Sequence, residues 1–196
     1  MWKHLRCRKR RRRRNGTLRE RQRFGGRRIQ QRPAIVTERR RIGDWEGDTI
    51  VGSGIARVVT LVERKSGFTR LRRVSSGQAR PTMRAVVQAL HPLIDHVHSL
   101  TLDNGSEFAE HGLIDVALET RCYFADPFAS WQRGCNENLN GLLRQYFPKR
   151  SDLGAITDEE LQRIEDRLND RPRKRLGYRS PREVFEAHLK RGALRG

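Results

Sequence analysis

Cysteines, aromatic residues and long apolar runs are all scarce in this sequence. The 196 residues include three cysteines, Cys7, Cys122 and Cys135, and no two of them lie close together. An odd, scattered set argues against a disulfide framework and favours a reducing compartment. No apolar run approaches the roughly 20 residues that cross a bilayer, and none follows the arginine-rich start as a secretory signal requires. We therefore expect a soluble, intracellular protein.

Acidic residues are scarce only at the start of the chain. Of the 42 Lys/Arg and 23 Asp/Glu, residues 1–41 hold 18 and 2, so most of the net charge of +19 lies there. Such a segment repels itself and has little to bury, so we expect a flexible basic DNA-binding arm and linker over residues 1–41 and a globular domain over residues 42–190. The favoured partner is a polyanion, because basic side chains that neutralise phosphates release counterions. The alternative is a solubilising or targeting tail.

The order of secondary-structure patterns predicts an α/β fold with a mixed sheet. Three predicted strands at residues 44–51, 56–64 and 68–74, the second alternating and rich in β-branched residues, are separated by short turns, which favours an antiparallel meander. Helices and strands then alternate: a helix from about 81, a strand at 97–102, a helix from about 106, a strand at 121–125, and a helix from between 130 and 136 to about 146. Capping boxes at Thr157 and Ser180 start two final helices. Helices should cover both faces of the sheet.

Three carboxylates suggest the chemistry. Asp48 lies in the first predicted strand, Asp103 follows the fourth, and Glu137 lies near the start of a later helix. Three acidic side chains gathered by a sheet and a helix can hold two divalent cations, which catalyse phosphoryl transfer on nucleic acid. We predict that Asp48 bridges both ions, with Asp103 on one and Glu137 on the other.

Each carboxylate also has a purely structural interpretation. Asp48 alternates with Asp44 and Glu46, so all three could form one solvated strand face. Asp103 begins an Asp-Asn-Gly turn in which it could bond its own backbone. Glu137 could be an ordinary exposed helix glutamate.

The flanking residues leave further alternatives open. The asparagines at 136, 138 and 140 are unusual in a helix. They could contact DNA phosphates or waters near the metals, or mark a frayed helix start. Trp131 could stack on a base, although we expect it to pack against the sheet.

Five strings resemble the DDE transposases of the insertion sequence 30 family. They are IGDWEGDTIVG, TLVERKSGFTRL, TLDNGSEFAEH, FADPFASWQRGCNENLNGLLRQYFPK and LNDRPRKRLGYRSPREVF, in this order between residues 42 and 185, and the whole resemblance spans roughly residues 32 to 187. The resemblance implies a ribonuclease H-like catalytic domain, as in retroviral integrases, with Asp48, Asp103 and Glu137 at the catalytic positions. Asp126 departs from the histidine expected in the family, and Leu139 from a small polar residue.

The same resemblance implies an activity and its partners. The implied activity depends on Mg²⁺, for which Mn²⁺ can substitute, and uses two ions in the site. The implied partners are insertion-sequence ends and target DNA. Water hydrolyses a phosphodiester, and the released 3′-hydroxyl attacks a second one by transesterification. A homo-multimer on DNA, in the nucleoid of the bacterial cytoplasm, is also implied. Because the family carries an N-terminal helix-turn-helix region, the chain is expected to be an N-terminally truncated catalytic fragment.

Two other functions are compatible with the sequence. One is a catalytically incomplete transposase remnant that acts only as a DNA-binding or multimerising module. The other is an RNA-associated basic protein whose function resides in the arm. The second leaves the ordered motifs of the domain unexplained.

Overall fold

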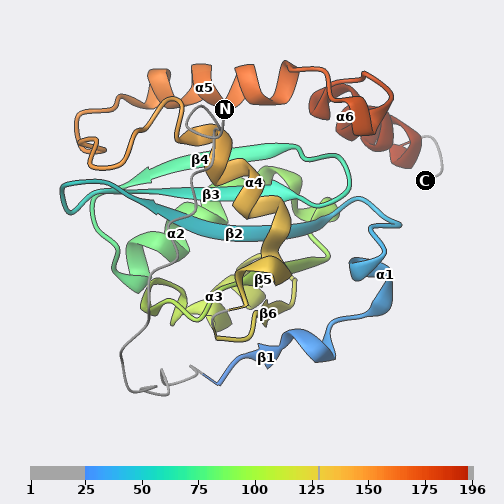
Figure 1. Ribbon diagram of the computed structural model, residues 1–196. Helices are drawn as coiled ribbons and strands as arrows, with labels where there is room; N and C mark the ends of the chain where they lie inside the picture. Colours follow the sequence, from blue (N-terminus) through green and yellow to red (C-terminus); the bar gives the residue numbers. More distant parts are fainter. Residues whose placement is uncertain (1–24, 128, 194–196) are drawn as a thin grey trace, which may run out of the picture.

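A single mixed sheet organises the part of the chain that the structure describes. The computed structural model describes residues 25–127 and 129–193. Its six strands lie in the order β1-β6-β5-β2-β3-β4 (Figure 1). They are β1 (Arg27–Arg28), β2 (Asp44–Val51), β3 (Arg57–Glu63), β4 (Thr69–Val74), β5 (Ser99–Leu102) and β6 (Cys122–Phe124). β2, β3 and β4 pair antiparallel, which confirms the predicted meander, whereas β5, β6 and β1 are added in parallel.

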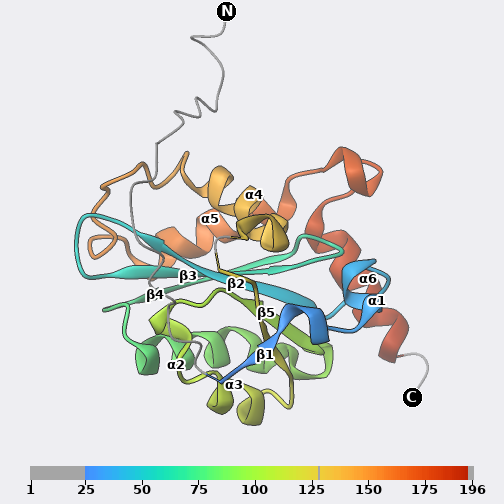
Figure 2. The ribbon, with the colours of Figure 1, turned by 60° about the horizontal axis from the view of Figure 1, so that its bottom comes forward.

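Helices cover both faces of the sheet, as the order of patterns predicted. α2 (Ala79–Leu90) and α3 (His111–Ala117) lie on one side, and α4 (Gly134–Leu143) and α5 (Asp158–Asp170) lie on the other (Figure 2). The remaining helices are α1 (Ala34–Thr37), α6 (Pro181–Ala193) and the 3-10 helices η2 (Ile29–Gln31), η3 (His91–His96), η4 (Ser106–Phe108), η5 (Ser130–Arg133) and η6 (Lys174–Leu176). No helix in the described part of the chain has the length and apolarity needed to cross a membrane.

Strand alternation divides the interior into two apolar cores. Trp45 and Leu61 belong to the core beneath α2 and α3, where Phe185 of α6 stacks on Phe68 at 4.6 Å between ring centroids. Ile50 and Val58 belong to the core beneath α4 and α5. Successive side chains of a strand point to opposite faces, so Glu46, Asp48 and Ile50 of β2 share the α4 face.

Both predicted capping boxes are confirmed. Thr157 Oγ1 accepts a hydrogen bond from the backbone N–H of Glu160 (3.1 Å), and the Glu160 carboxylate accepts one from the N–H of Thr157 (3.0 Å). Ser180 and Glu183 exchange the same pair of bonds at the start of α6. These reciprocal bonds satisfy N–H groups that a helix start leaves unpaired.

Two regions differ in detail from the predicted elements. The helix expected from about residue 106 is broken into η4 and α3. Residues 25–41, assigned to the arm and linker, contain β1, η2 and α1, and Val36 of α1 is fully buried. A two-residue strand has no periodicity of its own, so only its pairing with β6 reveals it. Residues 1–24 lie outside the described residues, and the predicted arm remains a prediction there.

Candidate active site

The register of two parallel strands brings Asp48 and Asp103 to the same place. β2 pairs with β5 through Asp44 opposite Ser99 and Glu46 opposite Thr101, an offset of 55 residues. Asp48 and Asp103 are also 55 residues apart in the sequence. Extending the register by two residues therefore sets the two carboxylates side by side, where β5 ends at Leu102.

An arginine lies between these two carboxylates. Nη1 of Arg133 lies 3.0 Å from Oδ2 of Asp48, and Nη2 lies 3.4 Å from Oδ2 of Asp103. Nη1 also donates to the carbonyl oxygen of Gly47 at 3.2 Å. The Arg133 side chain is 9% exposed, against 19% for Asp48 and 34% for Asp103. Both predicted aspartates thus share one cationic group.

The environment of Asp48 raises the pKa of its carboxyl. Burial is the main cause that raises the pKa of this carboxyl above its usual value, and the nearby negative charge of Asp103 adds to the shift. The guanidinium of Arg133 and the backbone N–H of Thr49 oppose it. A cation that neutralises both carboxylates would stabilise their ionised forms, because an opposite charge nearby favours the charged state.

α4 carries Glu137 across the same face of the sheet. The helix contacts β2 and β3 (Figure 1), and Glu137 lies in its first turn with an exposed side chain. The residue before it, Asn136, is fully buried and donates its backbone N–H to the Glu46 carboxylate at 2.9 Å. Asn140, one turn later, donates its side-chain amide to Oδ2 of Asp48 at 3.0 Å. These bonds fix the start of α4 relative to β2.

A threonine of β3 completes this network. The hydroxyl of Thr60 lies 3.4 Å from the side-chain oxygens of both Asn136 and Asn140. Thr60 pairs with Asp48 across the two strands. Asn136 and Asn140 are therefore built into the junction between helix and sheet, which contradicts the alternative that they mark a frayed helix start.

The alternative of a solvated strand face is wrong. Asp44 is 1% exposed and receives two hydrogen bonds from Arg41 at 2.9 Å, and Glu46 is fully buried and pairs with Arg64 at 2.8 Å. Buried carboxylates must be paired because their desolvation is costly. The turn interpretation of Asp103 does hold in part, since its Oδ1 accepts the N–H of Gly105 at 3.0 Å.

The donor set fits a divalent cation, although it is incomplete as it stands. Asp48 and Asp103 offer carboxylate oxygens, the ligands that Mg²⁺ prefers. Within residues 25–127 and 129–193, no three His, Cys, Asp or Glu side chains are arranged to hold an ion. The structure thus brings Asp48 and Asp103 together around Arg133, and it leaves the exposed Glu137 outside this pair.

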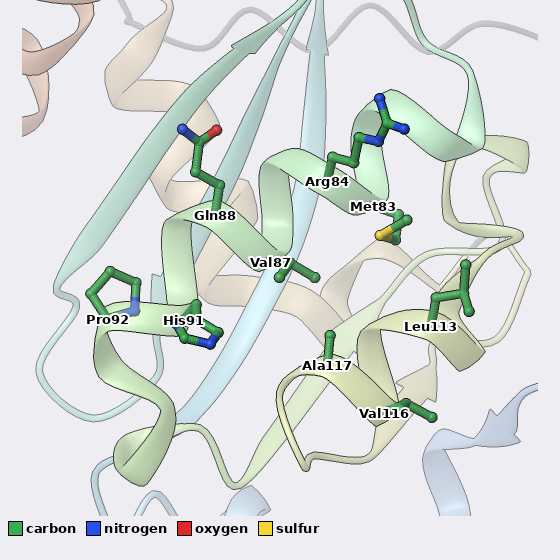
Figure 3. A pocket seen from close by; sticks show the side chains of 9 residues that line it. All are labelled: Met83, Arg84, Val87, Gln88, His91, Pro92, Leu113, Val116 and Ala117. Atoms are coloured by element: carbon green, nitrogen blue, oxygen red, sulfur yellow. The ribbon is translucent and has the colours of Figure 1, made fainter.

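A separate groove lies on the other side of the sheet, between α2 and α3. Its lining consists of Met83, Arg84, Val87, Gln88, His91, Pro92, Leu113, Val116 and Ala117 (Figure 3). Leu113 and Val116 are 51% and 78% exposed. The lining contains no carboxylate, so this groove does not supply the carboxylate ligands through which Mg²⁺ is usually bound.

Sequence reasoning missed the partners of the carboxylates. Arg133 is one of 42 Lys/Arg and Glu46 one of 23 Asp/Glu, and no local pattern separates either from the rest. The expectation that Trp131 packs against the sheet is wrong, because this side chain is 72% exposed. The alternative of base stacking, which requires an exposed indole, stays a prediction.

The chain is similar to known transposases. It is 41% identical over 167 residues to the transposase for insertion sequence element IS4351 of Bacteroides fragilis, which covers 85% of this chain and 51% of that protein. It is 40% identical over 159 residues to the transposase InsI for insertion sequence element IS30C of Escherichia coli, over 81% of this chain and 42% of that protein. The chain thus spans about half the length of the curated relatives it matches. No family model matches it.

A solved structure shares the fold. A chain of the simian T-cell lymphotropic virus intasome, in complex with PP2A regulatory subunit B56 gamma, superimposes with a TM-score of 0.53 at 20% sequence identity. The match covers 64% of this chain and 48% of that chain. Together with the six-stranded mixed sheet, it confirms the predicted ribonuclease H-like α/β fold.

Proposed function

Because this chain is a relative of the IS30-family transposases over about four fifths of its length, we propose that it is the catalytic part of a DNA transposase. Its reaction is metal-dependent phosphodiester hydrolysis followed by 3′-hydroxyl strand transfer at insertion-sequence ends. Asp48, Asp103 and Glu137 are the proposed catalytic residues and metal ligands. The observation that best supports this is the register that sets Asp48 beside Asp103 around one cationic group.

Each carboxylate has a proposed role. Asp48 would be a ligand of both Mg²⁺ or Mn²⁺ ions, Asp103 of one and Glu137 of the other. Bound ions of this kind activate the attacking oxygen and stabilise the leaving oxygen of an in-line displacement. The hydrogen bonds from Thr49 to Asp48 and from Gly105 to Asp103 orient the two aspartates without covering all their lone pairs.

DNA is the proposed substrate and partner. The net charge of +19 supports a polyanionic partner. The exposed Trp131, two residues before Arg133, offers an aromatic face to an unpaired base. We also propose that the chain acts as a homo-multimer on DNA, since two element ends must be joined to one target.

Replacing Asp103 by Asn tests the proposed reaction. Purified chain should nick and join DNA that carries an insertion-sequence end when Mn²⁺ or Mg²⁺ is present, and EDTA should stop it. Asp103→Asn should lower the rate on the order of a thousandfold, because removing one ligand takes away several kcal/mol of charge stabilisation in the transition state. Strand cleavage and joining are read on denaturing gels with end-labelled DNA.

Asp95→Asn is the matched control. Asp95 is exposed in η3, so this substitution removes the same charge away from the proposed ligands and should leave the rate unchanged. Cleavage by Asp103→Asn at the parental rate would contradict the assigned site. If the parent, Asp103→Asn and Asp95→Asn all fail to cleave DNA, the result would favour a remnant that only binds DNA or multimerises.

Deleting residues 1–24 should remove most of the salt-sensitive DNA affinity. The deletion removes 12 Lys/Arg and one Glu and leaves β1, which begins at Arg27, in place. The slope of log affinity against log salt should become shallower by about 0.9 for each phosphate that the arm no longer neutralises. Fluorescence anisotropy between low and moderate salt measures it, and circular dichroism checks that the domain remains folded. An unchanged slope would show that the arm does not bind DNA.

A further inference from the structure

Arg133 is placed where a cation would bind the two aspartates. It ends η5 at the N-cap position of α4, and it is buried. Its two terminal nitrogens reach Oδ2 of Asp48 and Oδ2 of Asp103 at 3.0 and 3.4 Å. A guanidinium that meets one carboxylate with each terminal nitrogen shares its single positive charge between the two, which a side chain beside only one of them would not do.

The surrounding bonds hold Arg133 in this position. Gln132 accepts the backbone N–H of Asp126 at 2.7 Å and returns a side-chain bond to the Asp126 carboxylate at 3.0 Å, so η5 is tied to the end of β6. Nε of Arg133 is buried and has no hydrogen-bond partner among the described residues. Burying an arginine with one donor unsatisfied is costly. The two carboxylates are what offset that cost.

The carboxylate oxygens are all engaged in this arrangement. Oδ2 of Asp48 meets Arg133 and also accepts the amide of Asn140 at 3.0 Å, and its Oδ1 accepts the N–H of Thr49 at 2.8 Å. Oδ1 of Asp103 accepts the N–H of Gly105. A second cation placed between Oδ2 of Asp48 and Oδ2 of Asp103 would meet the positive charge of Arg133 at close range, where Coulomb repulsion is strong.

We propose that Arg133 is an internal counter-ion that competes with a divalent cation for Asp48 and Asp103. This inference rests on the proposed function, which assigns the two aspartates as metal ligands. With Arg133 between them, one of the two negative charges is compensated within the chain itself. Metal binding then requires the guanidinium to leave, so Arg133 lowers the affinity of the resting site for metal.

The test measures metal binding directly, on the full chain without DNA. Mn²⁺ affinity is determined by electron paramagnetic resonance of the free ion for the parent, Arg133→Gln, Arg133→Lys and Arg144→Gln. Arg133→Gln should bind Mn²⁺ about tenfold more tightly, a gain of about 1.4 kcal/mol. Arg133→Lys should lie between parent and Arg133→Gln, because an ammonium keeps the charge but cannot bridge both carboxylates.

Arg144→Gln is the matched control. Arg144 caps the end of α4 and donates to the carbonyl oxygens of Val51 and Phe147. The substitution removes the same charge beside the same helix, so it should leave the Mn²⁺ affinity within about twofold of the parent. If Arg144→Gln gained as much Mn²⁺ affinity as Arg133→Gln, the loss of any positive charge would explain the result. Competition by Arg133 would then be refuted.

A second readout protects the test against misfolding. Without Mn²⁺, Arg133→Gln leaves two neighbouring carboxylates uncompensated, so its melting temperature should fall; added Mn²⁺ should raise it by more than in the parent. If the parent binds Mn²⁺ and both Arg133 variants bind it no more tightly, the competition is refuted and the metal site stands. If none of the four proteins binds Mn²⁺, the proposed metal site fails and this inference fails with it.

Discussion

Glu137→Gln should abolish metal-dependent strand cleavage, with a loss on the order of a thousandfold, whereas Glu107→Gln should cost less than about tenfold. The comparison matters because Glu107, four residues after Asp103, also lies beside the two aspartates. Glu107, on η4, bonds the Thr49 hydroxyl at 2.9 Å and is half-buried, while Glu137 is exposed. A proximity argument alone would choose Glu107 as the third ligand.

The anchoring of α4 favours Glu137. Its neighbour Asn136 is held by a buried carboxylate, so the first turn of α4 has a fixed position above β2. Glu107 already accepts a hydrogen bond from the Thr49 hydroxyl, and this bond explains the position of its side chain without a metal ion. An exposed carboxylate on an anchored helix turn can rotate toward an ion once the ion is bound, at the modest entropic cost of ordering one side chain.

Single-turnover cleavage rates at saturating Mn²⁺ measure both variants. Glu186→Gln on α6 is the control, because this glutamate is exposed and far along the chain from the site. The reverse outcome, with a large loss in Glu107→Gln and a small one in Glu137→Gln, would reassign the third ligand to Glu107. Equal large losses in both would indicate that four carboxylates take part.

Glu46→Ala should lower the free energy of unfolding by about 3–5 kcal/mol, the usual cost of removing one partner from a buried ion pair. Glu46 is fully buried, pairs with Arg64 at 2.8 Å and accepts the N–H of Asn136. Its loss leaves a buried guanidinium without its carboxylate and a helix N–H without an acceptor. Urea denaturation followed by circular dichroism measures the change.

The double variant Glu46→Met, Arg64→Met separates the ion pair from the helix anchor. Replacing both charges by apolar side chains should recover much of the stability, since no unpaired charge remains. The cleavage rate of the double variant should nevertheless fall below that of the parent, because the N–H of Asn136 lacks its acceptor and the turn that carries Glu137 is no longer fixed. A double variant with normal cleavage would show that Glu46 serves stability alone. A decrease below about 1 kcal/mol in Glu46→Ala would contradict the buried pair itself.

Local patterns were sufficient to predict most of the fold. Alternation in 44–51, 57–63 and 69–74 places every second side chain on one face, and that pattern is a property of the strand alone. The capping boxes at Thr157 and Ser180 are equally local, because the bonds join residues three apart. β1 escaped detection because a two-residue segment has no period, and its pairing with β6 joins residues almost a hundred positions apart.

The candidate site likewise has one part that the sequence predicts and another that only the tertiary structure shows. The sequence by itself determined the candidate carboxylates, because Asp48, Asp103 and Glu137 stand in extended strings that resemble a transposase family. Their role as metal ligands stays a prediction. Only the tertiary structure decided that Asp48 and Asp103 share Arg133, that Glu46 is buried, and that Trp131 is exposed. The physical reason is that charge pairing and burial depend on strand register and helix placement, which sum contributions from the whole chain. The sequence around a single arginine or glutamate does not indicate which residue it will contact in the folded chain.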